Sequence, residues 1–237
     1  MKVIGGERRR QVFVHGILIL VAGVTLGPLL VLLFNSMKSY VELGQNPLGP
    51  PAVIQLSNFV DAWNRGAFSK AMTSSLILVG LTLAGLLPLA GMAAYALSRR
   101  QFPGGGIVML YMLVASTLPL QLFLVPLFFT WAKLGLINNL FGVAIIYVGV
   151  FAPFSIFLLR SYMVQIPGDF EDAARIDGAN ELQIFRYVIV PLSWPGFLVS
   201  GLVATLAVWH EFLLATVFLT DGTTFTVVTS FSRFTTQ

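Results

Sequence analysis

The sequence predicts an all-α membrane protein, a polytopic bundle of five transmembrane helices, on three observations. Hydrophobic residues make up 57% of the 237 residues and charged residues only 10%. The mean hydropathy is +0.86, and a soluble fold could not cover so much apolar surface because soluble proteins carry about a quarter charged residues. The apolar residues also gather in five long stretches, each able to cross a bilayer core of about 30 Å as a helix.

Lipid requires every backbone polar group to pair within the segment, so each stretch is expected to be helical. We place the five spans at residues 13–34, 71–97, 107–131, 137–159 and 187–219. The last is long enough to tilt or bend. Prolines in or beside the spans predict kinks, which membrane helices tolerate when neighbouring groups satisfy the freed carbonyls. The first stretch is too long for a signal-peptide core, so it is expected to be a retained span.

The distribution of basic residues predicts the orientation. With the N-terminus in the cytoplasm, nine of the fourteen basic residues fall on the cytoplasmic side: Lys2, Arg8, Arg9, Arg10, Arg99, Arg100, Arg160, Arg175 and Arg186. The positive-inside rule favours this arrangement. Residues 36–70 then form an external loop, residues 160–186 a cytoplasmic loop, and residues 1–237 one membrane domain.

Several function classes are disfavoured by composition and motifs. The chain has no cysteine and only two histidines, which leaves no thiolate or histidine cluster for a metal. The net charge of +4 is scattered between apolar runs rather than gathered on one face, so nucleic-acid binding is not expected. Gly104, Gly105 and Gly106 lack the following Lys-Ser or Lys-Thr of a phosphate loop. No nucleophile and base are apparent, so an enzyme is not expected.

The cytoplasmic loop is the most informative segment, because it holds half of the ten acidic residues. Asp169 is predicted to cap a short helix that starts at Phe170 and ends near Gly178, with Asp172 as the capping-box residue. Asn180 is predicted to cap a second helix, with Gln183 at its third position. Two helices with a bend at Gly178 result.

Two interpretations of the first short helix stay open on the residues alone. Ala174 and Gly178 are four residues apart and share a face, with Ala173 beside them, so one side is flat enough to enter a groove of another protein. Alternatively, alanine is there as a good helix former, the acidic residues suit the helix dipole, and glycine ends the helix.

The same loop resembles a family signature. Residues 171–179 read EDAARIDGA and residues 188–191 read VIVP. This pattern is similar to the EAA signature of binding-protein-dependent ABC importer permeases, in which EAA, three residues and G are followed nine residues later by I-x-L-P. Asp172 stands for the signature glutamate, and the thirteen-residue step from Gly178 to Pro191 fits.

Further segments resemble the maltose-type carbohydrate permeases of this family. They are FNSMK at 34–38, NFVDAWN at 58–64, AAYALSR at 93–99, LGL at 134–136, PFSIFLLR at 153–160 and WHEF at 209–212. The resemblance implies a coupling helix that docks on an ATPase, a role that falls to Asp172, Ala173, Ala174 and Gly178, with Glu171 a weaker candidate and Pro191 completing the signature.

The resemblance also implies partners and a mechanism. ATP is hydrolysed by a separate ATP-binding cassette dimer, so this chain binds no cofactor. The sugar path is shared with a second, different permease subunit, and an extracytoplasmic sugar-binding protein delivers the substrate to a complex in the bacterial cytoplasmic membrane. Relatives usually have six spans, and residues 221–237 look like the external loop before a sixth, so the last helix is expected to be missing.

Three polar residues at membrane depth are candidates for the substrate path. His210 and Glu211 lie within the fifth span, where ionisable groups usually face a cavity or a partner; alternatively they sit near its outer end and reach the headgroups or a neighbouring helix. The family commonly has asparagine in place of His210. Gln121 in the third span can bind sugar, although a hydrogen bond between helices explains it as well.

A secondary transporter driven by an ion gradient is the main rival function. Such transporters show internal repeats and acidic residues in matched halves. Here no repeat is apparent, and Glu211 is the one acidic residue within a predicted span. A purely structural membrane subunit is disfavoured because an anchor has no need of the acidic loop.

Overall fold

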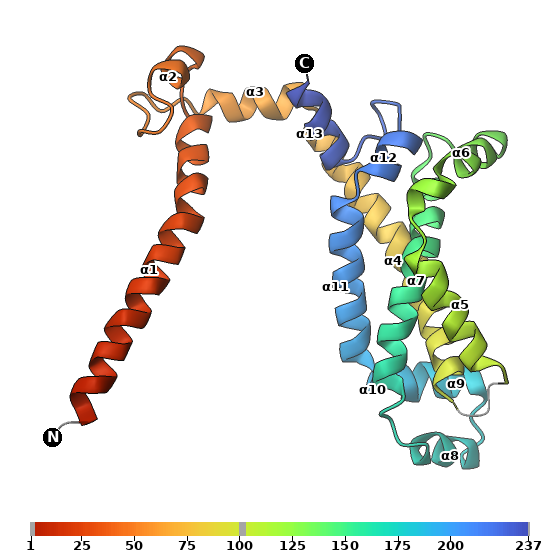
Figure 1. The fold of residues 1–237 in the computed structure, drawn as a ribbon. Coiled ribbons are helices and arrows are strands. Elements are labelled where there is room, and N and C mark those ends of the chain that lie inside the picture. Colours follow the sequence, from red (N-terminus) through yellow and green to blue (C-terminus); the bar gives the residue numbers. More distant parts are fainter. Residues whose placement is uncertain (1–2, 100–102, 237) are drawn as a thin grey trace. The chain divides into compact units, whose positions relative to one another are not determined.

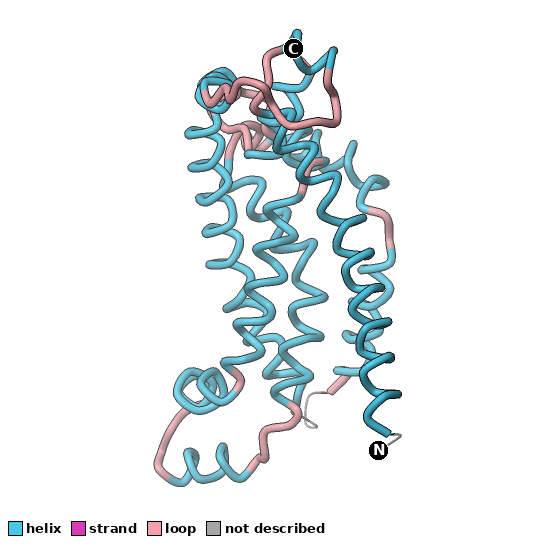
Figure 2. The backbone as a smooth tube through the Cα atoms, turned by 90° about the vertical axis from the view of Figure 1, so that its left-hand side faces the viewer, coloured by secondary structure: helices cyan, strands magenta, loops and turns pink. Residues whose placement is uncertain are grey.

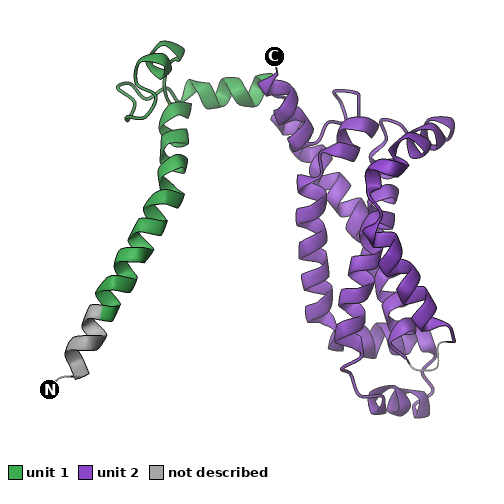
Figure 3. Cartoon of the chain, viewed as in Figure 1, with its two compact units in different colours: residues 1–65 green, residues 66–237 purple. Residues whose placement is uncertain are grey.

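The computed structural model describes residues 3–99 and 103–236, and every regular element in them is helical. Lys2 and Arg100, two of the basic residues assigned to the cytoplasm, lie outside the described residues. The chain divides into two compact units, residues 1–65 and 66–237 (Figure 3). The predicted all-α membrane fold is confirmed: within the described residues, three continuous helices are long and apolar enough to cross a membrane, and the number of spans reaches five if each of two bent helix pairs is one span.

The first unit begins with α1 (Val3–Ser36), which contains the first predicted span (Figure 1). From residue 10 onward nearly all of its side chains up to residue 33 are exposed, although most are apolar. A helix that is apolar all round is typical of a membrane span. Two shorter helices follow within the predicted external loop: α2 (Tyr40–Gln45) and α3 (Ser57–Arg65).

A buried lysine organises the segment between these helices. The Lys38 side chain is almost fully buried, and its Nζ donates hydrogen bonds to Asn35 Oδ1 at 2.9 Å and to the Asn46 carbonyl at 2.6 Å. Asn58 at the start of α3 donates its Nδ2 to the carbonyls of Ser36 and Lys38, at 3.0 and 2.9 Å. Two of the segments that carry the family resemblance therefore hold each other in place.

Replacing Asn58 with alanine is expected to loosen this segment. The change removes two hydrogen bonds of about 1 kcal/mol each, so local opening should become roughly 30-fold more frequent. The hydrogen-exchange rate of the Gln55 amide, which donates to the Met37 carbonyl at 2.9 Å, measures this opening. Asn64→Ala, at an exposed position on the same helix, is the control; equal exchange of the Gln55 amide in the two variants would show that Asn58 has no such role.

The second unit holds the remaining elements. In chain order these are α4 (Phe68–Ser98), α5 (Gly105–Thr117), the 3-10 helix η1 (Leu120–Phe123), α6 (Leu124–Lys133), α7 (Leu140–Met163), α8 (Asp169–Ile176), α9 (Glu181–Ile184), the π-helix η2 (Phe185–Ile189), α10 (Val190–Leu192), α11 (Trp194–His210), α12 (Leu213–Phe218) and α13 (Val227–Thr235).

Helices α4, α7 and α11 pack together along their lengths and form the core of this unit (Figures 1 and 2). One buried cluster, at the end near α12, includes Tyr147, Leu214 and Phe218. A second cluster, at the end near α8, includes Leu86 and Ile184. The second and fourth predicted spans are confirmed, because α4 and α7 are each long and apolar enough to cross a membrane.

Gly91 allows α4 to approach its neighbours closely. A Cβ atom at this position would lie 2.7 Å from the Phe197 ring on α11 and 3.3 Å from the Phe185 ring on η2. Small residues commonly let membrane helices pack at short distance. The glycine thus fixes how near α4 comes to the broken region before α11.

The third predicted span is not one helix, contrary to expectation. α5 ends at Thr117, and the segment from Leu120 to Lys133 turns away from it by 87°. Leu118 is extended, at φ −73° and ψ 131°, because the residue before a proline, here Pro119, avoids the helical region. Pro119 was expected to kink the helix, but it ends it.

The fifth predicted span is broken at both ends. The chain bends by 78° at the start of α11, after Ser193, and the helix stops at His210, since Glu211 is extended at φ −69° and ψ 122°. Residues 221–237, expected to form a loop, contain α13. Its Ser230 hydroxyl donates to the Gly66 carbonyl, and the Val227 amide donates to Ser75 Oγ at 2.9 Å, so α13 packs on the start of α4.

Candidate functional site

The short helix α8 lies at one end of the second unit, between α7 and α9 (Figure 1). Its predicted start is wrong by one residue: the helix begins at Asp169, and Gly168 is the N-cap, without a side-chain cap. A residue whose side chain caps a helix usually has an extended backbone. Here the backbone is already helical at Gly168, with φ −64° and ψ −24°, so Asp169 lies inside the helix and does not cap it. Asp172 bonds Arg175 instead of closing a capping box.

The end of α8 and the start of α9 follow the prediction. Gly178 has φ +85°, the left-handed conformation that favours glycine. The Ala179 amide donates to the Ala174 carbonyl at 2.9 Å and the Gly178 amide to the Arg175 carbonyl at 3.0 Å, which is a Schellman motif. The predicted capping box of Asn180 with Gln183 is present. The bend at Gly178 is therefore confirmed.

Glu171 faces the interior of the protein, unlike the other acidic residues of α8. Its side chain is 4% exposed and forms an ion pair with Arg99 at the end of α4. The Tyr95 hydroxyl, one turn earlier on α4, lies 3.1 Å from Glu171 Oε2 and 3.1 Å from Glu181 Oε2, so it can donate to either. The helical pattern alone does not tell which side of α8 is covered.

Arg175 joins three carboxylates around the same point. It donates to Asp172 at 3.0 Å, to Glu171 at 3.3 Å and to Glu181 at 3.1 Å. The hydrogen bond with Glu181 raises the pKa of the Arg175 guanidinium above its ordinary value, so this group stays charged. The network links α8 to α9 and, through Glu171, to α4.

The side of α8 that faces away from Glu171 is open and partly apolar. Phe170 is 50% exposed, Ala173 is exposed and Ile176 is 87% exposed. We name these three residues, spaced three apart, the outer face of α8. Ala174 is half-buried against the neighbouring core cluster. Gly178 is exposed, and a Cβ there would meet open space.

The helix break after α11 places Glu211 two residues before the start of α12 at Leu213. Its carboxylate accepts hydrogen bonds from the amides of Leu214, at 2.9 Å, and Ala215, at 3.1 Å, and from the Tyr147 hydroxyl at 2.7 Å. This carboxylate therefore closes the break, a role that the sequence pattern did not suggest. His210, at the end of α11, is exposed.

Gln121 also lies at a helix break. It belongs to η1, between α5 and α6, and its side chain is exposed. The three predicted path residues thus lie at helix breaks, His210 and Glu211 at the break after α11 and Gln121 at the break after α5. Irregular backbone at membrane depth is tolerated where it lines a cavity or is buried in protein. Pro191, in α10, lies beside the bend before α11.

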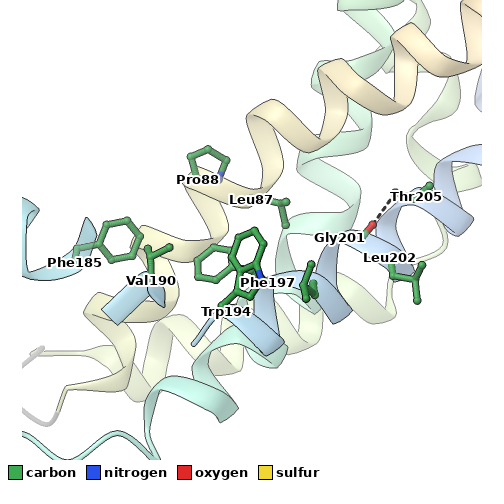
Figure 4. A pocket seen from close by; sticks show the side chains of 10 residues that line it. Leu87, Pro88, Phe185, Val190, Trp194, Phe197, Gly201, Leu202 and Thr205 are labelled. Carbon is green, nitrogen blue, oxygen red and sulfur yellow. Dashed lines mark hydrogen bonds between the residues drawn. The ribbon is translucent and has the colours of Figure 1, made fainter. Parts of the chain in front are cut away.

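A cavity of about 580 Å³ opens between α4, η2 and α11 (Figure 4). Leu87, Phe197 and Leu202 contribute to its almost entirely apolar wall. The Thr205 hydroxyl is already used, because it donates to the Gly201 carbonyl at 2.8 Å. A lining of this kind offers few hydrogen-bond partners to the hydroxyl groups of a sugar.

Comparison with known proteins shows the family. The model of the family described as binding-protein-dependent transport system inner membrane component matches residues 86–237, and the chain belongs to this family. It is therefore a membrane-integral permease, and the resemblance found in the sequence is confirmed. Membership implies an ABC importer with an ATPase and a binding protein as partners.

Individual relatives extend over most of the chain. The diacetylchitobiose uptake system permease protein NgcG of Streptomyces coelicolor is 34% identical over 91% of this chain and 71% of its own length. The trehalose transport system permease protein SugB of Mycobacterium tuberculosis is 31% identical over 83% of this chain and 71% of its own.

A solved structure has the same fold. A chain of a bacterial ABC transporter involved in the import of the acidic polysaccharide alginate matches with a TM-score of 0.79 and 25% identity, over 95% of this chain and 79% of that one.

Proposed function

We propose that this chain is the permease subunit of an ATP-driven importer for carbohydrate. The names of similar permeases support a sugar or oligosaccharide as substrate: they refer to diacetylchitobiose, trehalose and arabinooligosaccharides. The sequence around α8 supports ATP as the energy source, because it follows the signature of permeases that are coupled to an ATPase.

The end of the second unit at α8 is assigned to the cytoplasm. Arg99, Arg160, Arg175 and Arg186 gather there, at the ends of α4 and α7 and in α8 and η2. The positive-inside rule supports a cytoplasmic location for this end, and with it a cytoplasmic N-terminus. α12 and α13, near the other end of α4, then face the outside, where a sugar-binding protein delivers the substrate.

The observation that carries the proposal is the outer face of α8. This face is solvated and partly apolar on a helix whose opposite side is fixed by buried ionic contacts, as a docking helix requires. Ala173 and Ile176 contact the ATPase, and the exposed carboxylate of Asp172 lies at the rim of the contact. Ala174, Gly178 and Pro191 shape the turn and the bend behind the helix, and Glu171 holds it from the inside.

ATP is hydrolysed by the ATPase dimer, and this chain supplies no nucleotide site. Closure of the ATPase moves α8, which reorients the spans around a path shared with a second, different permease subunit. His210, Glu211 and Gln121 lie at helix breaks, the positions at which membrane transporters often expose backbone and polar groups to substrate. The exposed apolar surface of α1 meets lipid and the second permease.

Uptake by proteoliposomes tests the energy source and the substrate class together. The complete importer, with its ATPase, second permease and binding protein, is expected to accumulate a labelled oligosaccharide only when ATP is enclosed with the ATPase. Dissipating proton and sodium gradients should leave the rate unchanged. Uptake that needs an ion gradient and not ATP would replace the proposal with a secondary transporter, and ATP-driven uptake of a non-carbohydrate solute alone would correct the substrate class.

A further inference from the structure

Glu171 differs from the other acidic residues at the start of α8. Asp169 and Asp172 are exposed, whereas the Glu171 side chain is 4% exposed and pairs with Arg99, whose own side chain is 25% exposed. The Tyr95 hydroxyl donates a hydrogen bond to the same carboxylate. The Arg99 guanidinium lies over the Tyr95 ring, with its Cζ 5.4 Å from the ring centroid. These contacts join α8 to the end of α4 directly, 76 residues back along the chain in the case of Tyr95.

The end of α4 is also held by α7. Arg160, in the last turns of α7, donates its Nε to the Leu97 carbonyl at 2.9 Å, which satisfies one of the free carbonyls at the end of α4. α8 follows α7 in the chain through the turn at Pro167 and Gly168. Glu171 and Arg160 therefore attach α8 and α7 to one point, the last turn of α4.

Such a buried pair is poorly explained by stability alone. Removing two charges from water costs about as much free energy as their attraction returns, and well-packed apolar residues often stabilise a protein equally well. A buried pair does, however, fix one arrangement of two elements, because a single remaining charge cannot be buried alone. The contact is suited to holding α8 in one position against α4.

We propose that Glu171 and Arg99 are a positioning pair that fixes α8 to α4, so that force applied to α8 by the ATPase moves α4 and its partners α7 and α11. This inference rests on the proposed docking of the ATPase at α8. Without the pair, the ionic contact of α8 with the end of α4 is lost, and α8 is held by its two end turns, by the packing of Ala174 and by the bond of Arg175 with Glu181. The ATPase then still docks on α8, but the movement of α8 is taken up by the turns at its two ends and does not reach α4.

Sugar imported per ATP hydrolysed is the first measurement, made with the complete importer in proteoliposomes. Glu171→Gln is expected to lower this ratio by about two- to thirtyfold, the range that substitutions in coupling networks produce, while the ATPase still co-purifies. Asp169→Asn, the same chemical change at an exposed position of the same helix, is the control and should keep the ratio. An unchanged ratio in Glu171→Gln overturns the proposal.

A double-mutant cycle separates a pair from two independent effects. If the two side chains act through each other, Arg99→Gln combined with Glu171→Gln should couple no worse than the poorer single variant. Fold losses that multiply contradict the pair. The cycle does not test the docking proposal itself, which would be refuted if the wild-type permease did not bind the ATPase.

A distance measurement tests the tether without the ATPase. The chain has no cysteine, so spin labels can be placed at exposed positions with Ala96→Cys on α4 and Asp177→Cys after α8. In the two-permease complex in nanodiscs, the label pair is expected to give one narrow distance distribution, which Glu171→Gln broadens and Asp169→Asn does not. An equally narrow distribution in Glu171→Gln refutes the tether whether or not the ATPase binds.

Discussion

Ala173→Arg is expected to abolish docking of the ATPase while leaving the permease folded. Ala173 lies on the outer face of α8, exposed between Phe170 and Ile176. An arginine there brings bulk and an unpaired charge to the centre of the contact, and burying an unpaired charge costs about 3–5 kcal/mol. The dissociation constant of the ATPase should therefore rise by at least about a hundredfold. Binding titrations with the purified two-permease complex measure it.

Val53→Arg is the matched control for this variant. Val53 is 65% exposed in the segment assigned to the outside, so the same kind of change there should leave ATPase affinity as in wild type. Ala174→Arg is less informative, because Ala174 packs against the core and its replacement disturbs folding. Equal affinity in Ala173→Arg and Val53→Arg would place the ATPase elsewhere on the permease.

Glu211→Ala is expected to have the largest effect on stability. It removes acceptors from the amides of Leu214 and Ala215 and from the Tyr147 hydroxyl, all close to side chains that are fully buried. Three hydrogen bonds to a charged acceptor contribute at least about 3 kcal/mol. For a chain of this length the midpoint of thermal unfolding in detergent should fall by roughly 6–12 °C.

Two further variants decide what Glu211 does. Tyr147→Phe removes one of the three bonds and should give about a third of the shift. His210→Ala alters the exposed neighbour and should give almost none. If Glu211→Ala matches His210→Ala in stability but loses sugar uptake, Glu211 serves the substrate path rather than the helix break.

Local chemistry made part of this structure predictable from sequence. The spans could be placed because about 20 consecutive apolar residues have few alternatives to crossing lipid. The capping box of Asn180 and Gln183 and the turn at Gly178 could also be predicted, because they involve residues at most five apart in the sequence. The helix start at Asp169 was missed because two neighbouring residues, Gly168 and Asp169, compete for the cap.

The remaining features depend on residues far apart in the chain. Glu171 was ranked as the weaker docking candidate, because its pairing with Arg99 and Tyr95 is not visible in the loop itself. Pro119 accounts for the end of α5, but the direction of the 87° turn accompanies the packing of α6 against α12, which periodicity does not report. From the sequence Glu211 was assigned to the substrate path, because nothing in the pattern shows that a helix ends there. Its carboxylate in fact caps the start of α12, a helix that begins only after that break.

Photo-crosslinking from α8 in membranes tests the central claim most directly. Since this chain has no cysteine, a benzophenone maleimide reacts with the chain only at Ile176→Cys. The ATPase subunit is expected to be captured from Ile176 in the complete importer and not from Val53→Cys labelled in the same way. Absence of an ATPase adduct at Ile176, with the assembled complex verified in the same membranes, would contradict docking at α8.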